Sequence, residues 1–143
     1  MKAMAILASN LRHLGQQGKQ TILHFDEGLI GFSDCKDFQL MESDSIAPFR
    51  LLQSSQVKEV GFLVLEPKTV MPDYYSRIPY REWESIGLMR GEPQLAFVIC
   101  VIGATSKQST GNFQAPLIIN YKTMIGRQVI LTDVALSVRQ SLV

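Results

Sequence analysis

The chain has 143 residues, of which 46% are hydrophobic and 19% are charged, and its formal net charge is +1 at pH 7. This composition is typical of a globular domain with a buried core, and it excludes a largely disordered chain. A charge balance so close to neutral also lacks the basic excess of a nucleic-acid-binding surface. We therefore expect one domain over residues 1–143 that binds no nucleic acid directly.

The apolar runs are short. The run at residues 3–8 is too short for the core of a signal peptide, and the longest run, residues 95–104, is about half of a membrane span. Two cysteines, Cys35 and Cys100, fit neither a disulfide framework nor a zinc site. We expect a cytoplasmic protein without membrane contact, in which Cys100 lies in the core and Cys35 is exposed.

Short apolar runs separated by turn residues predict a mainly β chain. We expect strands over residues 3–12, 20–25, 37–42, 49–54, 60–65, 94–103, 114–122 and 127–132. Gly15 and Gly18 would turn the first strand into the second, and Gly126 would supply a positive φ in a tight turn between Tyr121 and Val129. Residues 95–102 are apolar on both faces, so this strand must be covered on both sides, as in a barrel or a closed sandwich.

One short helix is predicted between the fifth and sixth of these strands. Pro79 can occupy the first helical position, residues 80–86 continue the helix, and Gly87 suits its C-terminal end. Trp83 and Ile86 would form an apolar stripe that packs on the sheet. Residues 66–73 contain two prolines and are expected to form a loop before this helix.

Catalytic chemistry has little support in the sequence. The two histidines each stand alone, His13 at the end of the first predicted strand and His24 in the second, and no nucleophile elbow, phosphate-binding loop or dinucleotide-binding glycine pattern is present. Glu82 and Glu84 are two residues apart on the predicted helix and therefore diverge. We expect no catalytic residues, no cofactor and no metal. An enzyme would require His24 to meet a carboxylate or Cys35 within a cleft.

Charge is unevenly distributed along the chain. Acidic residues are concentrated between residues 20 and 66: Asp26, Glu27, Asp34, Asp37, Glu42 and Asp44. This acidic segment is either a solvated face or a contact for a basic partner. Tyr74 and Tyr75 lie near several arginines and could stack on bases, but Asp73 and Glu82 dilute the positive charge and the spacing matches no recognition module.

Five motifs, in the same order, resemble the FliW family of flagellar assembly factors. Residues 22–32 resemble F-P-x-G-L-x-G-F, and residues 48–54 resemble P-F-x-x-L-Q-S. Residues 62–67 and 72–74 are similar to F-x-V-x-x-P and P-D-Y, residues 110–120 to T-x-N-L-x-A-P-I-x-I-N, and residues 126–131 to G-x-Q-x-I-L. Together they cover the chain from about residue 20 onward. The resemblance implies a small antiparallel β-barrel.

The sequence also departs from the family pattern. Asp26 stands where the family usually has proline, and Phe113 replaces the usual leucine. Residues 136–140 resemble Y-S-x-R-H but lack its tyrosine and histidine. Residues 1–19 match poorly, and family members are usually strongly acidic, whereas this chain is not.

The resemblance implies a regulatory, chaperone-like role without catalysis. FliW proteins hold flagellin in the cytoplasm before export, and when free of flagellin they bind CsrA and stop it repressing translation of flagellin mRNA. An apolar groove on a β-protein can receive an amphipathic flagellin helix, and residues 49–54 and 110–120 are expected to frame it. The residues expected to bind partners are Phe49, Gln53, Ser54, Asn112, Phe113, Pro116 and Asn120.

Each motif residue also has a structural interpretation. Gly28 and Gly31 suit turns, Phe25 and Phe32 suit the core, and the Asn112, Asn120 and Gln53 side chains can bond to backbone. Because a net charge of +1 steers a basic partner weakly, we expect flagellin binding to be retained more readily than CsrA binding. The alternative is a FliW-like barrel that has lost CsrA binding and binds only flagellin or another protein.

Overall fold

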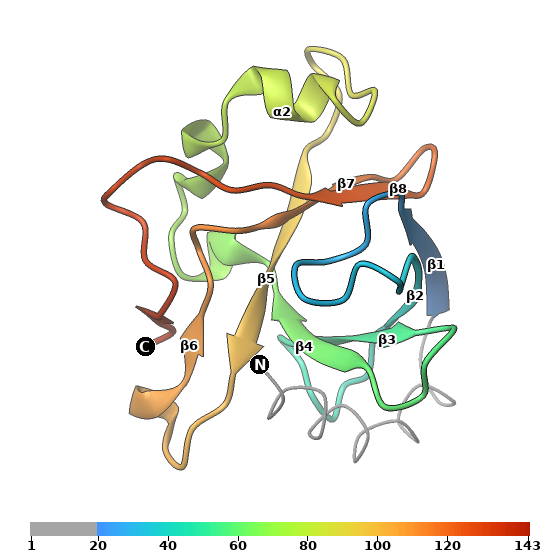
Figure 1. The fold of residues 1–143 in the computed structure, drawn as a ribbon. Helices are drawn as coiled ribbons and strands as arrows, with labels where there is room; N and C mark the ends of the chain where they lie inside the picture. The colour runs from blue at the N-terminus through green and yellow to red at the C-terminus, as the bar shows by residue number, and fades with distance from the viewer. Residues whose placement is uncertain (1–19) are drawn as a thin grey trace.

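A computed structural model describes residues 20–143, in which strands curl into a closed barrel (Figure 1). The barrel order is β4-β3-β2-β1-β8-β7-β5, and β4 pairs with β5 to close it. The strands are β1 (Gln20–Phe25), β2 (Asp37–Met41), β3 (Arg50–Ser54), β4 (Gly61–Leu65), β5 (Leu95–Val101), β6 (Thr110–Gly111), β7 (Leu117–Asn120), β8 (Ile125–Gln128) and β9 (Gln140–Ser141). Strands β6 and β9 extend the sheet beyond β5.

Most strand pairs are antiparallel, as expected. Strands β1 to β4 form a meander in which Leu23 pairs with Phe38 and Leu52 pairs with Phe62. The exception is the pair β1 and β8, which is parallel and contains only His24↔Ile125 and Phe25↔Gly126. The predicted fold class, a mainly β chain that forms a small antiparallel β-barrel with one short helix, is confirmed, and the β1–β8 pair is its one parallel departure within residues 20–143.

Strand β5 is covered on both faces, as its sequence predicts. Phe97 joins an apolar cluster inside the barrel with Phe25, Phe38 and Phe62. The neighbouring residues of β5 point to the opposite face because successive side chains of a strand alternate. They join a second apolar cluster, built around Trp83, whose β5 members are Ala96, Val98 and Cys100.

The second cluster lies between the barrel and a helical segment. This segment comprises the 3-10 helices η2 (Pro67–Thr69) and η3 (Tyr74–Arg77) and the helix α2 (Tyr80–Glu84), and Figure 1 shows α2 above β7 and β8. Trp83, a residue of α2, is fully buried between the helix and the barrel. Gly87, with φ +80°, follows the helix and permits the chain to turn back. The helix and its packing face are confirmed, whereas Pro79 caps the helix instead of beginning it.

Two predicted details are wrong. Gly126 lies inside strand β8, and the positive φ of the preceding turn is taken by Met124 at +61°. Position 126 instead requires glycine because two segments of the chain approach closely there: a β-carbon would lie 2.5 Å from the Cε2 atom of Phe25. Cys35 is buried, not exposed, because the loop returns it to the barrel cluster despite polar neighbours.

Several element bounds also differ from the prediction. The last predicted strand, at 127–132, begins two residues earlier and ends at Gln128. The expected loop at 66–73 contains η2, and residues 20–143 include a further 3-10 helix, η4 (Ser106–Gln108). The two-residue strands β6 and β9 were not predicted, since so short a segment has no periodicity. The predicted strand at 3–12, the turn at Gly15 and Gly18, and His13 lie outside the described residues.

Candidate functional site

An uncharged hollow, here called the Phe49 hollow, lies beside the C-terminal end of β5. Its volume is about 480 Å³, and its lining has no acidic or basic side chain. Residues that contribute to it include Pro48, Phe49, Val70, Ile102 and Leu142. Since Ile102 follows β5 directly and is 40% exposed, the hollow offers apolar surface to a partner.

A second hollow, here called the Asn112 hollow, has a volume of about 580 Å³. It forms where β4 and β5 separate, because their pairing consists only of Val64↔Ile99 and Leu65↔Val98. Its lining includes Ile30, Phe62, Ile99, Val101, Asn112 and Val138, and Arg139 is its one charged residue. Val101 and Ile102 are adjacent in sequence and line different hollows.

The 110–120 segment is held by its own polar side chains. The Oδ1 atom of Asn112 accepts hydrogen bonds from the backbone N–H of Gln114 at 3.1 Å and of Ala115 at 3.2 Å. Phe113 is fully buried, with its ring edge-on to Tyr74 at 5.2 Å between centroids. The Tyr74 hydroxyl donates to the carbonyl oxygen of Phe113 at 2.5 Å, and burial raises the Tyr74 pKa above its ordinary value.

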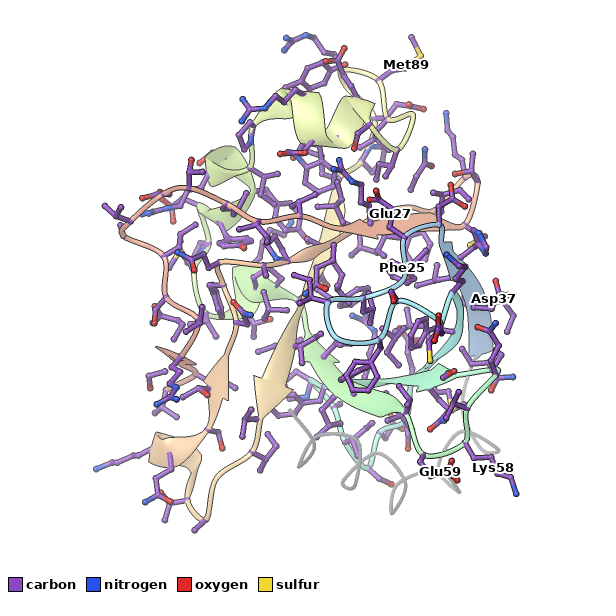
Figure 2. All side chains as sticks on the ribbon, viewed as in Figure 1. Phe25, Glu27, Asp37, Lys58, Glu59 and Met89 are labelled. Carbon is purple, nitrogen blue, oxygen red and sulfur yellow. The ribbon has the colours of Figure 1, made fainter. Side chains whose placement is uncertain are left out.

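Two more of the predicted site residues fold the turn between β3 and β4. The Gln53 side-chain amide donates to the carbonyl oxygens of Ser54, Lys58 and Val60. The Ser54 hydroxyl accepts from the backbone N–H groups of Gln56 and Val57. Lys58 and Glu59 lie at the exposed tip of this turn (Figure 2). The two side chains thus fix the turn from inside the protein.

Asn120 ties the helical segment to the barrel. Its Nδ2 atom donates to the carbonyl oxygen of Ile86 at 2.9 Å, and its Oδ1 accepts from the backbone N–H of Lys122 at 3.0 Å. Of the seven residues expected to bind partners, Phe49 and Asn112 therefore line the two hollows. The other five are buried: Gln53, Ser54, Phe113, Pro116 and Asn120.

The acidic segment is paired largely within the chain. His24 Nδ1 lies 2.7 Å from Asp37 Oδ1, and His24 Nε2 lies 2.7 Å from Asp26 Oδ1. These two bonds raise the His24 pKa above 6.5, because both carboxylates favour the imidazolium. The bond to Asp37 has the larger effect. Asp37 lies at the outer edge of the molecule beside β1 (Figure 2). Asp26, at the usual proline position of the family pattern, is thus bonded to a histidine two residues earlier.

Further pairs join acids of this segment to arginines. Arg127 Nε lies 3.3 Å from Glu27 Oε1, and Arg127 Nη1 lies 3.3 Å from Glu82 Oε1. The Arg50 Nε atom donates to Glu42 Oε1 at 2.6 Å. Asp34 and Asp44 remain as exposed acids. The field that this segment presents to a basic partner is therefore partly neutralised by the protein itself.

The catalytic alternative required His24 to meet a carboxylate or Cys35 in a cleft. His24 does meet two carboxylates, but its side chain is 40% exposed at the surface of β1, and Cys35 is buried in the barrel cluster. Among residues 20–143, no group of three or more His, Cys, Asp or Glu side chains could hold a metal ion. Within the same residues, no helix is long and apolar enough to cross a membrane.

Sequence reasoning did not identify three of the apolar residues that line the two hollows: Ile102, Val138 and Leu142. Ile102 belongs to an apolar run interpreted as a central strand, although the pairing of β5 ends at Val101. Leu142 and Val138 come from the C-terminal segment, which was considered only for its motif resemblance. An apolar run in the sequence that extends past the end of strand pairing indicates apolar surface of this kind.

Comparison with known proteins places these features in a family. A family model described as "FliW protein" matches residues 11–142. The flagellar assembly factor FliW of Leptospira interrogans is 34% identical over 128 residues, which cover 89% of this chain and 85% of the relative. The Anoxybacillus flavithermus protein of the same name is 33% identical, with 82% and 81% covered. A crystal structure of the flagellar assembly factor FliW superposes with a TM-score of 0.76 at 30% identity, covering 85% of this chain and 84% of that chain.

Proposed function

The chain belongs to the FliW family, and from this premise we propose that it acts in flagellar assembly by binding flagellin before export. Bound flagellin would occupy the factor, and the free factor would bind CsrA and relieve repression of flagellin mRNA. The observation that best supports a protein-binding role is the Phe49 hollow, whose lining has no charged side chain and includes the exposed residues Ile102 and Val143. Apolar surface of this kind is stabilised by a partner that covers it.

The Phe49 hollow suits the apolar side of an amphipathic segment. Phe49 and Pro48 form one wall, and Ile102 and Leu142 come from the opposite side. The two segments that were expected to frame one groove border different hollows: 49–54 begins at this hollow, and 110–120 begins at the Asn112 hollow. A flagellin segment that has not yet paired in a filament exposes the complementary apolar face.

The predicted site residues divide into two roles in this proposal. Phe49 and Asn112 touch the partner, because both line hollows. The buried residues hold the surface in shape: Gln53 and Ser54 fold the β3–β4 turn, and the Phe113 carbonyl is fixed by Tyr74. Substitution of one of these buried residues would thus weaken partner binding indirectly, by disturbing the folded shape of the surface.

CsrA binding is the weaker part of the proposal. A basic partner gains association rate from an unpaired acidic surface, but here His24, Arg50 and Arg127 occupy several of the acids. The second candidate function, a barrel that binds flagellin and has lost CsrA, is favoured by the same observation. Association with CsrA that is fast and steeply dependent on salt would contradict this ranking.

The experiment is calorimetric titration of the purified protein with flagellin and, separately, with CsrA. We expect dissociation constants for flagellin of about 1 μM or lower. Ile102→Glu places a charge in the Phe49 hollow and should weaken flagellin binding at least about tenfold. Ile130→Glu is the matched control, since Ile130 is 65% exposed outside that hollow. Absence of binding to both partners by folded protein would refute the proposal.

A further inference from the structure

Strand β9 forms one edge of the extended sheet. It pairs with β6 through Thr110↔Ser141 and Gly111↔Gln140, and the N–H of Leu142 donates to the carbonyl oxygen of Ser109 at 3.2 Å. In an antiparallel pair the backbone groups of alternate residues point to the same side. The backbone N–H and C=O groups of Gln140 and Leu142 therefore point toward β6. The backbone N–H and C=O groups of Arg139 and Ser141 point away from the sheet.

Several of the outward backbone groups have side-chain partners from the same segment. The Arg139 N–H donates to Ser137 Oγ at 3.0 Å. The Ser141 carbonyl accepts from Gln140 Nε2 at 3.3 Å, and the Val143 N–H donates to Ser141 Oγ at 3.3 Å. The last two bonds are longer than the usual N–H···O distance of about 2.9–3.0 Å. A partner backbone can replace them at little cost.

Apolar surface flanks this edge on both faces of the sheet. Val138, 53% exposed, lines the Asn112 hollow, and Val143, 78% exposed, lines the Phe49 hollow. Successive side chains of an extended strand point to opposite faces. A strand added beside β9 would therefore direct alternate side chains toward the two hollows. Backbone pairing would supply affinity and the hollows would supply selectivity.

Charge identifies the segment further. Arg139 is exposed and lines the Asn112 hollow, and no ion pair joins it to an acid within residues 20–143. An arginine beside an apolar hollow favours a carboxylate on the partner, because the fork of N–H groups matches the carboxylate oxygens.

We propose that an extended segment of the protein partner adds to the sheet as a strand beside β9. The segment is apolar at alternating positions and carries an acidic residue that meets Arg139. This inference rests on the proposed function for the identity of the partner, flagellin, and it assigns the manner in which that partner is held. The side-chain bonds of Ser137, Gln140 and Ser141 protect the edge until the partner arrives.

The test uses the full chain and flagellin, with calorimetry as the readout. Ser141→Pro removes the outward N–H of Ser141 and leaves both bonding positions toward β6 intact, as prolines do on edge strands. We expect this variant to weaken flagellin binding about tenfold or more. Ser141→Ala is the matched control, which keeps the backbone N–H and removes the protecting hydroxyl, so its affinity should be equal to or above that of the wild type.

Two further measurements keep the inference separable from the proposed function. Arg139→Glu leaves the backbone donors unchanged and should weaken binding at least about threefold, even if proline proves to destabilise β9. Slower hydrogen exchange of the Arg139 and Ser141 amides should accompany flagellin binding. If the wild type fails to bind flagellin, the proposed function is wrong. If it binds, but Ser141→Pro and Arg139→Glu bind equally well, the strand-addition inference is overturned and the function stands.

Discussion

Gly126 lies against the ring of Phe25 at the point where the first and eighth strands pair. A β-carbon on Gly126 would stand 2.5 Å from Cε2 and 2.7 Å from Cζ of that ring. Because Phe25 is buried in the barrel cluster, its ring has little room to move away.

Substitution Gly126→Ala is therefore expected to destabilise the protein by about 1–3 kcal/mol, which is typical of overpacking a core. The free energy of unfolding in urea measures the effect. Phe25→Leu should relieve the clash, so the double variant should lose less stability than the two single variants together. Additive losses would show that the ring is not the cause.

The buried bond between Tyr74 and Phe113 provides a second test. Tyr74→Phe keeps the ring in place and leaves the carbonyl oxygen of Phe113 without its donor. We expect a loss of about 1–3 kcal/mol in the free energy of unfolding. Tyr80→Phe, at a partly exposed ring, should change stability far less. An unchanged urea midpoint for Tyr74→Phe would contradict the role assigned to this bond.

The bonds of His24 predict a dependence of stability on pH. Asp37 and Asp26 raise the folded-state pKa above 6.5, so the protonated ring stabilises the folded protein. That contribution is complete below pH 6.5 and is lost as pH rises through the folded-state value. The difference in unfolding free energy between wild type and His24→Gln should be largest near about pH 5.5 and below about 1 kcal/mol, since the pair is exposed.

The measurement for His24 is urea unfolding of both proteins from about pH 5.5 to about pH 9. Lys36, whose Nζ donates to the carbonyl oxygen of Asp26 at 2.6 Å, is the other charged group at this site and stays unchanged in both proteins. A difference that does not vary across this range would show that the ring does not titrate with the two carboxylates.

Asn120 offers a test of how the helical segment is attached. Asn120→Ala removes the donor to the Ile86 carbonyl and the acceptor for the Lys122 N–H. We expect a loss of about 1–3 kcal/mol and faster hydrogen exchange around residues 84–88. Thr123→Ala, an exposed neighbour in the same turn, is the control. Exchange that accelerates equally in both variants would contradict the proposed attachment.

The strands of the first meander were predictable because local sequence carries their signal. Apolar residues in β1 to β4 are bounded by turn residues, and each predicted bound differs from the observed one by at most one position. Strand β5 was predictable as well, because its apolar pattern on both faces required two layers of cover. The pattern of apolar residues in a sequence indicates which residues are buried, and in these strands the buried residues recur along the strand.

Gly126 and Cys35 show where local reasoning fails. A glycine indicates either a positive φ or a close approach of another chain segment, and sequence alone did not distinguish the ring of Phe25 from a turn. Polar neighbours of Cys35 suggested exposure, but a residue between two polar ones can still point inward. Both outcomes depend on segments distant in sequence.

The candidate site was predictable only in part. Motif residues such as Gln53, Phe113 and Asn120 proved to be buried, because a motif marks geometry as readily as contact. The hollows themselves arise where the β4–β5 pairing ends and where the C-terminal segment returns, and the return of the C-terminal segment leaves no local pattern. Phe49 and Asn112 line the hollows because they lie at or near the start of the segments that border them, and their contact with a partner stays a prediction.

The parallel pair of β1 with β8 has a consequence for synthesis on the ribosome. It joins His24 to Ile125, residues about one hundred positions apart, so the entropy of a long loop must be lost before the barrel closes. Until β8 has left the exit tunnel, β1 keeps an open edge that invites wrong pairing. A newly made chain therefore cannot close its barrel until β8 has been synthesised and can pair with β1.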